Sequence, residues 1–192
     1  MTISFTHARD TIPMTRTPTM PRDTLAGLMP LPQSYATHGD ARRTPRVWRV
    51  FVPAGARVPN AILREELPAY RLVATPAEAD LVLLSESVAD LPPGLKPWQV
   101  KESYGLSCTA TQVLVRSTFD RGRNHALRTL GQLLVLGNGR LGQVEITDWP
   151  ALPFRGAHLT LGSGHQPTFP RLKAFITDLA RLKISSLTIE HD

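Results

Sequence analysis

Three features are scarce in this sequence: cysteine, aromatic side chains and long hydrophobic runs. Its single cysteine, Cys108, excludes an internal disulfide framework and a cysteine-based zinc cluster. No apolar run approaches the roughly 18 residues that a bilayer span requires, and residues 1–23 lack the basic head and apolar stretch of a secretory signal. We therefore expect no membrane partner, and the lack of a signal favours the cytoplasm without fixing the location.

Aromatic residues make up 6% of the chain, and their scarcity bears on the meaning of its positive charge. The 22 lysines and arginines exceed the 16 acidic residues and give a net charge of +6, which raises nucleic acid as a partner class. The basic residues are scattered over residues 42–46, 116–128 and 171–183, and aromatic residues do not alternate with them as a stacking platform requires. We expect no nucleic-acid partner, and salt-sensitive retention on heparin or DNA would contradict this expectation.

Motifs for metals, cofactors and activated nucleophiles are also missing. No metal-ligand spacing occurs, and the glycine-rich stretch GSGH at 162–165 precedes neither Lys-Ser nor Lys-Thr, so it does not form a phosphate loop. Cys108 lies in a predicted strand, where we expect a half-buried thiol that packs as a small apolar group. The sequence nominates no base that would activate it. We predict no metal and no cofactor.

Residues 26–150 predict an α+β domain in which helices pack on a sheet. The preceding residues, 1–25, are rich in Thr, Pro, Met and Arg without a hydrophobic period, which predicts a disordered leader. Strands are expected at 46–54, 79–87, 143–150 and, as a tight pair, within 102–118; helices are expected from Asn60 to Pro68 and at 120–137. In the longer helix we expect Asp120 to cap the start and Gly137 to end it in the left-handed conformation.

Residues 151–192 follow a different pattern. A strand at 154–161, a helix at 168–183 with Thr168 as N-cap and a strand at 184–192 predict one βαβ unit with parallel strands. Such a unit cannot stand alone, because each strand needs neighbours and one helix covers only one face. The expectation is therefore the opening of a (β/α) barrel that these residues leave incomplete.

The sequence at the start of that unit resembles a known domain junction. ITDWPALPFRGAHL, at 146–159, is similar to the "I-x-D-x-P-x-[FL]-P-x-R-G" run of glycoside hydrolase family 20, the β-N-acetylhexosaminidases. In that family the run joins an N-terminal α+β domain to strand one of a (β/α)₈ barrel. The matching positions are Ile146, Asp148, Pro150, Pro153, Arg155 and Gly156.

Three further segments resemble the same family in the same order. They are the entry segment at 28–40, the closing strands and helix of the N-terminal domain at 102–134, and barrel helix one with strand two at 168–192. Two positions depart from the family pattern. Thr160 stands where many members have the Asp of "L-D-x-x-R", with no Arg before the helix, and Ser185 replaces the usual Asn. The glycine-rich turn in that place resembles the divergent, hexosaminidase-D-like branch.

The resemblance implies glycoside hydrolysis, but the catalytic residues of the family follow a barrel strand that residues 1–192 do not reach. Family members cleave terminal N-acetylhexosamines by substrate-assisted catalysis, in which an Asp-Glu pair after barrel strand four supports the attack of the sugar's own acetamido group. Residues 1–192 reach strand two only, so we assign no catalytic residue and expect the chain to be inactive. An N-acetylhexosamine-containing glycan is the expected partner only of a completed barrel.

Candidate substrate-binding residues lie where the C-terminal rim of a barrel would form, because barrel active sites are built there. Glu190 and Asp192 end the second strand, and His165 lies on the loop that follows the first. By contrast, His158 is expected to be a core histidine, and Arg155 to tie the junction to the N-terminal domain by hydrogen bonds.

An alternative from another class stays open. The chain could be a non-enzymatic interaction module whose C-terminal βαβ unit pairs with a partner, or it could self-associate through the unpaired edge of that unit. Glu145 and Asp148 form a strand-end acidic pair for which the sequence suggests no partner base.

Overall fold

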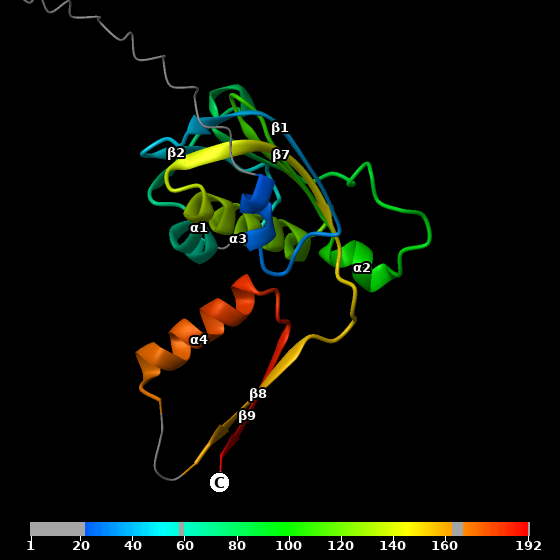
Figure 1. Cartoon of the computed structure of the whole chain (residues 1–192), viewed down its shortest axis with the longest axis vertical. Coiled ribbons are helices and arrows are strands. Elements are labelled where there is room, and N and C mark those ends of the chain that lie inside the picture. The colour runs from blue at the N-terminus through cyan, green and yellow to red at the C-terminus, as the bar shows by residue number, and fades with distance from the viewer. Residues whose placement is uncertain (1–21, 58–59, 163–166, 192) are drawn as a thin grey trace, which may run out of the picture.

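The structure is a computed structural model that describes residues 22–57, 60–162 and 167–191. Two sheets organise the described chain: a seven-stranded sheet of order β1-β7-β5-β6-β4-β2-β3 and a two-stranded sheet formed by β8 and β9. Figure 1 shows that α1 and α3 cover one face of the large sheet, and that α4 lies on the far side of these two helices. The mixed α+β fold that the sequence predicts is confirmed.

The large sheet combines a parallel half with an antiparallel half. Strands β2, β3, β4 and β6 run parallel to one another, whereas β5, β7 and β1 pair antiparallel in succession from β6. Its strands are β1 (Ser34–Arg43), β2 (Trp48–Phe51), β3 (Tyr70–Leu72), β4 (Leu81–Leu84), β5 (Tyr104–Cys108), β6 (Val113–Arg116) and β7 (Arg140–Asp148). The helical segments around it are η1 (Arg22–Gly27), α1 (Asn60–Glu66), η2 (Pro76–Glu78), α2 (Pro97–Glu102) and α3 (Asp120–Leu136).

The smaller unit consists of β8 (Gly156–Leu161), α4 (Phe169–Arg181) and β9 (Ser186–His191). The two strands pair in parallel, as the strand–helix–strand pattern predicts, and they join no strand of the large sheet. Thr168 stands at the N-cap of α4, although its side chain makes no capping hydrogen bond.

A hydrophobic core fills the space between the large sheet and α3. The continuous apolar run of β4 is buried, as expected for a strand covered on both faces. From α3 the predicted stripe of Ala126, Leu127, Leu130 and Leu133 is fully buried, while Leu134 at its margin is only partly so. Burial of this stripe explains why α3 is helical, because an amphipathic face gains most of its stability from packing. Cys108 is also fully buried rather than half-buried, and burial raises the pKa of its thiol to about 12.

Both predicted ends of α3 need correction. Phe119 is the N-cap, and Asp120 is instead the first helical residue, with its carboxylate accepting a hydrogen bond from Arg123. At the C-terminal end Gly137 keeps right-handed dihedrals, and the positive φ values belong to Asn138 and Gly139. Space rather than handedness explains the glycine at 137, because a Cβ there would lie 1.9 Å from the Arg140 carbonyl oxygen.

Two elements at the N-terminal side were not predicted. Strand β1 lies within the entry segment and forms an edge of the sheet, and its side chains are mostly exposed, so it carries no alternating pattern. Helix η1 includes the last residues of the segment expected to be a disordered leader, and its Leu25 is buried in the core. Residues 1–21 of that segment lie outside the described residues. Within the described ranges, no helix has both the length and the apolar character that a membrane span needs.

Candidate functional site

The candidate residue Glu190 lies near the C-terminal end of β9, on a polar face of the small sheet. Thr160 pairs with Glu190 and His158 pairs with Thr188 across the two parallel strands. Because side chains alternate along a strand, these four residues share one face. The Nε2 atom of His158 lies 3.1 Å from Glu190 Oε2, and the two side chains are 56% and 59% exposed. His158 is therefore a surface residue beside Glu190, which corrects its predicted place in a core.

The other two candidates, His165 and Asp192, lie outside the described residues, so they remain predictions. Glu190, the one candidate that lies within the described residues, has His158 beside it. An imidazole beside a carboxylate offers both a donor and acceptors for the hydroxyl groups of a polar ligand. The contact between the two side chains adds little stability at this exposure. Within the described ranges, no group of three His, Cys, Asp or Glu side chains is placed to hold a metal ion.

Much of the apolar surface of the unit, above all that of α4, is exposed. No residue of α4 is buried, although its sequence forms a strongly amphipathic helix. Its exposed apolar residues are Phe169, Phe175 and Ile176, followed by Leu182 at its end and Ile189 on β9. A helix normally buries such a stripe against a neighbour. Within the described residues, the apolar stripe of α4 has few neighbours to pack against.

The connection between β7 and β8 holds the first of two polar clusters that join the unit to the large domain. Arg155 donates hydrogen bonds to the carbonyl oxygens of Lys183 and Leu152, at 2.8 Å each, and to the Glu102 carboxylate. This confirms that Arg155 ties the junction. The Nε2 atom of His125 lies 3.3 Å from the same carboxylate. Hydrogen bonding from His125, and then from Arg155, holds the pKa of Glu102 at about 2, below its usual 4.5.

The second cluster centres on Lys183, which follows α4. Its Nζ donates to Asp148 Oδ2 at 2.6 Å and to the Tyr104 hydroxyl at 2.9 Å, and the Tyr104 hydroxyl lies 2.7 Å from that of Thr129. Burial lowers the pKa of Lys183, and the charge of Asp148 opposes that effect. Asp148 therefore has a basic partner, contrary to the sequence-based expectation. Its presumed companion Glu145 is engaged separately, by the hydroxyl of Ser107.

Lys183 was missed because its sequence signal resembles that of a solvated residue. A lysine after the last turn of an amphipathic helix normally points to water and favours the helix C-terminus. Lys183 adopts a positive φ of 58°, and its side chain is 7% exposed. A buried lysine almost always requires an acidic partner, and the sequence gives no indication that Asp148, 35 residues earlier, would be that partner.

A small cavity of about 140 Å³ lies at this junction, and the charged side chains that line it belong to the two clusters. The charged and hydroxyl groups that line it are those of Glu102, Tyr104, His125, Asp148, Arg155 and Lys183. Each of these groups already has a partner within the protein. The cavity therefore belongs to the joint between the two parts of the chain.

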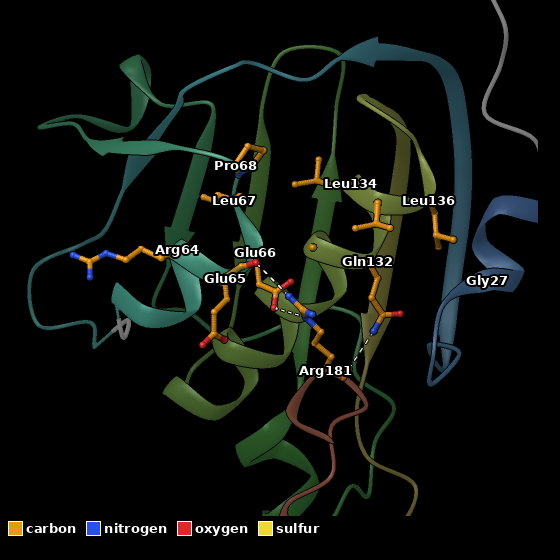
Figure 2. A pocket seen from close by; sticks show the side chains of 12 residues that line it. Gly27, Arg64, Glu65, Glu66, Leu67, Pro68, Gln132, Leu134, Leu136 and Arg181 are labelled. Atoms are coloured by element: carbon orange, nitrogen blue, oxygen red, sulfur yellow. Dashed lines mark hydrogen bonds and ion pairs between the residues drawn. The ribbon is translucent and has the colours of Figure 1, made fainter. Parts of the chain in front are cut away.

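A wider groove of about 640 Å³ lies between α1, α3 and the end of α4 (Figure 2). Arg181 reaches across it, donating from Nε to Glu66 Oε1 at 3.1 Å, and Gln132 Nε2 donates to the Arg181 carbonyl oxygen at 3.1 Å. Glu66 also pairs with Arg128 of α3. Leu134 and Leu136 contribute apolar walls.

Comparison with solved structures identifies proteins that have a similar fold. No protein-family model matches the chain. The β-N-acetylhexosaminidase of Bacteroides fragilis superposes with a TM-score of 0.67 at 21% identity, covering 84% of this chain and 32% of that one. The Vibrio harveyi family 20 exo-β-N-acetylglucosaminidase, in complex with N-acetylglucosamine, gives 0.67 at 18% identity, with 96% and 28% covered. The Streptomyces coelicolor family 20 β-N-acetylhexosaminidase gives 0.66 at 20% identity, with 86% and 34% covered.

These identities establish a likeness of fold, and the coverage limits its extent. The chain spans about a third of the length of the structures that it matches. The fold of this chain is therefore similar to the fold of one part, about a third of the length, of these family 20 structures.

Proposed function

We propose that this chain is the N-terminal portion of a β-N-acetylhexosaminidase-like glycoside hydrolase, most similar to the hexosaminidase-D-like branch. In this proposal residues 26–150 form the accessory domain, and residues 151–192 form the first βαβ unit of the catalytic barrel. The single observation that carries it is the parallel β8–α4–β9 unit, which follows the seven-stranded sheet and builds a sheet of its own. The likeness of fold to family 20 enzymes supports the same reading.

The proposed role of this portion is to support a sugar site rather than to perform the reaction. Substrate-assisted hydrolysis of the family type needs an Asp-Glu pair fixed beside an enclosed sugar, and two strands cannot enclose one. A (β/α)₈ barrel needs about 250 residues. The polar face that carries His158 and Glu190 would line the sugar site of a completed barrel, with Glu190 binding substrate hydroxyl groups. His165 and Asp192 are proposed for the same rim from the sequence alone.

Assay of the full chain on an aryl N-acetylglucosaminide tests this proposal. We expect no release of the aryl alcohol above the buffer rate, while an authentic β-N-acetylhexosaminidase in a parallel sample shows that the assay works. Turnover at enzyme-like rates would mean that these residues contain an active site that the proposal does not recognise. Reading the DNA beyond codon 192 supplies the positive test. A continuing frame that encodes further βα units and an Asp-Glu pair would support the family, and an unrelated sequence would contradict it.

A second candidate is a non-enzymatic interaction module whose βαβ unit is completed by another polypeptide. The observation that favours it is the uncovered apolar face of α4, which has no buried residue. Size-exclusion chromatography separates the two candidates. A defined oligomer in which α4 becomes protected supports the module, whereas polydisperse association supports an unfinished hydrolase portion.

A further inference from the structure

The β8–α4–β9 unit is attached to the large domain through a buried lysine, Lys183, whereas the large domain is held together by an apolar core. Among the described side chains from 151 to 190, Lys183 is the only one that is buried. A unit docked by the hydrophobic effect would bury leucine or phenylalanine first. Here Phe169 of α4 is 77% exposed, whereas Lys183, which carries an ammonium group, is 6% exposed.

In the ion pairs between the two parts of the chain, the positive charges come from residues after 150 and the negative charges come from the large domain. Three cations, Arg155 just before β8 and Arg181 and Lys183 within the unit, each meet a carboxylate of the domain. Those carboxylates are Glu102 at the end of α2, Glu66 at the end of α1 and Asp148 at the end of β7. All three carboxylate side chains are less than 10% exposed. The domain therefore contributes only carboxylates to these three ion pairs, although the chain as a whole carries a net charge of +6.

We propose that these three ion pairs form a charge-keyed joint, in which the Asp148–Lys183 pair fixes the β8–α4–β9 unit on the domain and can be released without unfolding the domain. The joint is independent of any sugar chemistry, so it stands whether or not the hydrolase proposal holds. Two features make the Asp148–Lys183 pair its centre. It is the one pair of the three in which both side chains are less than 10% exposed, and its second acceptor, Tyr104, anchors it to the interior of the large sheet.

Burial makes this pair sensitive to the loss of one partner. Replacing both members of a buried ion pair by neutral groups is often tolerated, whereas removing one leaves the other charge buried without compensation. The groups that face Asp148 are Lys183, the Tyr104 hydroxyl and the backbone N–H of Gln33. In Asp148→Asn the remaining side-chain oxygen can still accept from the Gln33 N–H, while an NH2 group replaces the oxygen that accepts from Lys183. The variant therefore removes both the charge and the acceptor that Lys183 uses.

Hydrogen–deuterium exchange of the full chain, resolved by peptide, tests the joint. In the wild type, amides of β8, α4 and β9 should be protected. In Asp148→Asn and in Lys183→Met, their exchange should accelerate roughly a hundredfold, the lower end of what loss of one partner of a buried pair produces, while peptides of β5 and β6 keep their protection. The double variant Asp148→Asn/Lys183→Met should recover much of the protection, because neither charge is then stranded.

A matched control is Asp80→Asn, which breaks the Arg49–Asp80 pair between β2 and the start of β4. It should raise exchange in the large sheet without a selective effect on the unit. Three results would overturn the proposal: equal exchange of the unit in wild type and single variants, acceleration of β5 and β6 together with the unit, or additive effects in the double variant. Limited proteolysis between 151 and 155 gives an independent reading, since opening of the joint should expose this connection.

Discussion

The large domain and the β8–α4–β9 unit obey different rules of assembly. The domain buries Trp48, Leu83 and Leu130 completely, together with a continuous set of apolar neighbours. The unit has a more strongly amphipathic helix, yet it buries no apolar residue of that helix and buries one lysine instead. The comparison teaches that a well-patterned helix sequence ensures a helix but does not ensure a core. A core also requires a second surface, which the domain supplies to α3 and does not supply to α4.

The largest effect that separates the two regions should come from truncating their apolar side chains. Leu130→Ala removes a fully buried side chain from α3 and should lower the free energy of unfolding by about 2–5 kcal/mol. Phe169→Ala removes a larger side chain from α4, yet at 77% exposure it should change that free energy by no more than about 0.5 kcal/mol. Urea denaturation followed by circular dichroism measures both. Equal losses would mean that α4 is packed in solution.

The next effect is the pH dependence contributed by Glu102. Its pKa is about 2 in the folded protein and near 4.5 when unpaired, so the unfolded chain binds more protons between these values. The stabilisation is complete above pH 4.5 and is lost as the pH falls toward 2. It amounts to at most about 3 kcal/mol.

Urea denaturation at pH 7 and pH 3 measures this contribution. Glu102→Gln should be less stable than the wild type at pH 7 and should lose less stability on going to pH 3. Glu86→Gln is the control, because Glu86 pairs with Arg116 at an exposed position, and its pH dependence should match that of the wild type. An unchanged pH dependence in Glu102→Gln would contradict the role assigned to the Arg155–Glu102–His125 cluster.

The smallest effect concerns association of one copy with another. Both strands of the small sheet have a free edge among the described residues, and free parallel edges favour intermolecular pairing. We expect the apparent mass in sedimentation to rise with protein concentration. Ile189→Lys, which places a charge on β9, should reduce this rise, whereas Val47→Lys at a similarly exposed apolar position of the domain should not. Association that is insensitive to Ile189→Lys would place the contact elsewhere.

The same contrast explains which features the sequence could predict. Strand β4 and helix α3 were predicted because burial on a defined face imposes a period on the residues. The parallel β8–α4–β9 unit was predicted for the same reason, since its pattern is retained even where its apolar face lies uncovered. Strand β1 was missed because an exposed edge strand needs no alternation, and its pairing with β7 depends on backbone hydrogen bonds.

The candidate site was predictable only in part. The position of Glu190 near the end of β9 follows from strand order, which the sequence reveals. Its neighbour His158 was misassigned, because an apolar sequence around a histidine does not show which face of a two-stranded sheet will be covered. The Asp148–Lys183 and Glu102–Arg155 contacts join residues 35 and 53 positions apart, and their pairing depends on tertiary geometry that local pattern does not encode.

Amine-reactive footprinting of the native full chain tests the central claim most directly, namely that the unit is anchored through a buried Lys183. The four lysines of the chain are Lys96, Lys101, Lys173 and Lys183. The first three are exposed, and Lys173 lies on α4 itself. Mass spectrometry after brief treatment with an acylating reagent should show Lys183 protected relative to Lys173, with the difference abolished in Asp148→Asn. Equal labelling of Lys173 and Lys183 in the wild type would contradict the account.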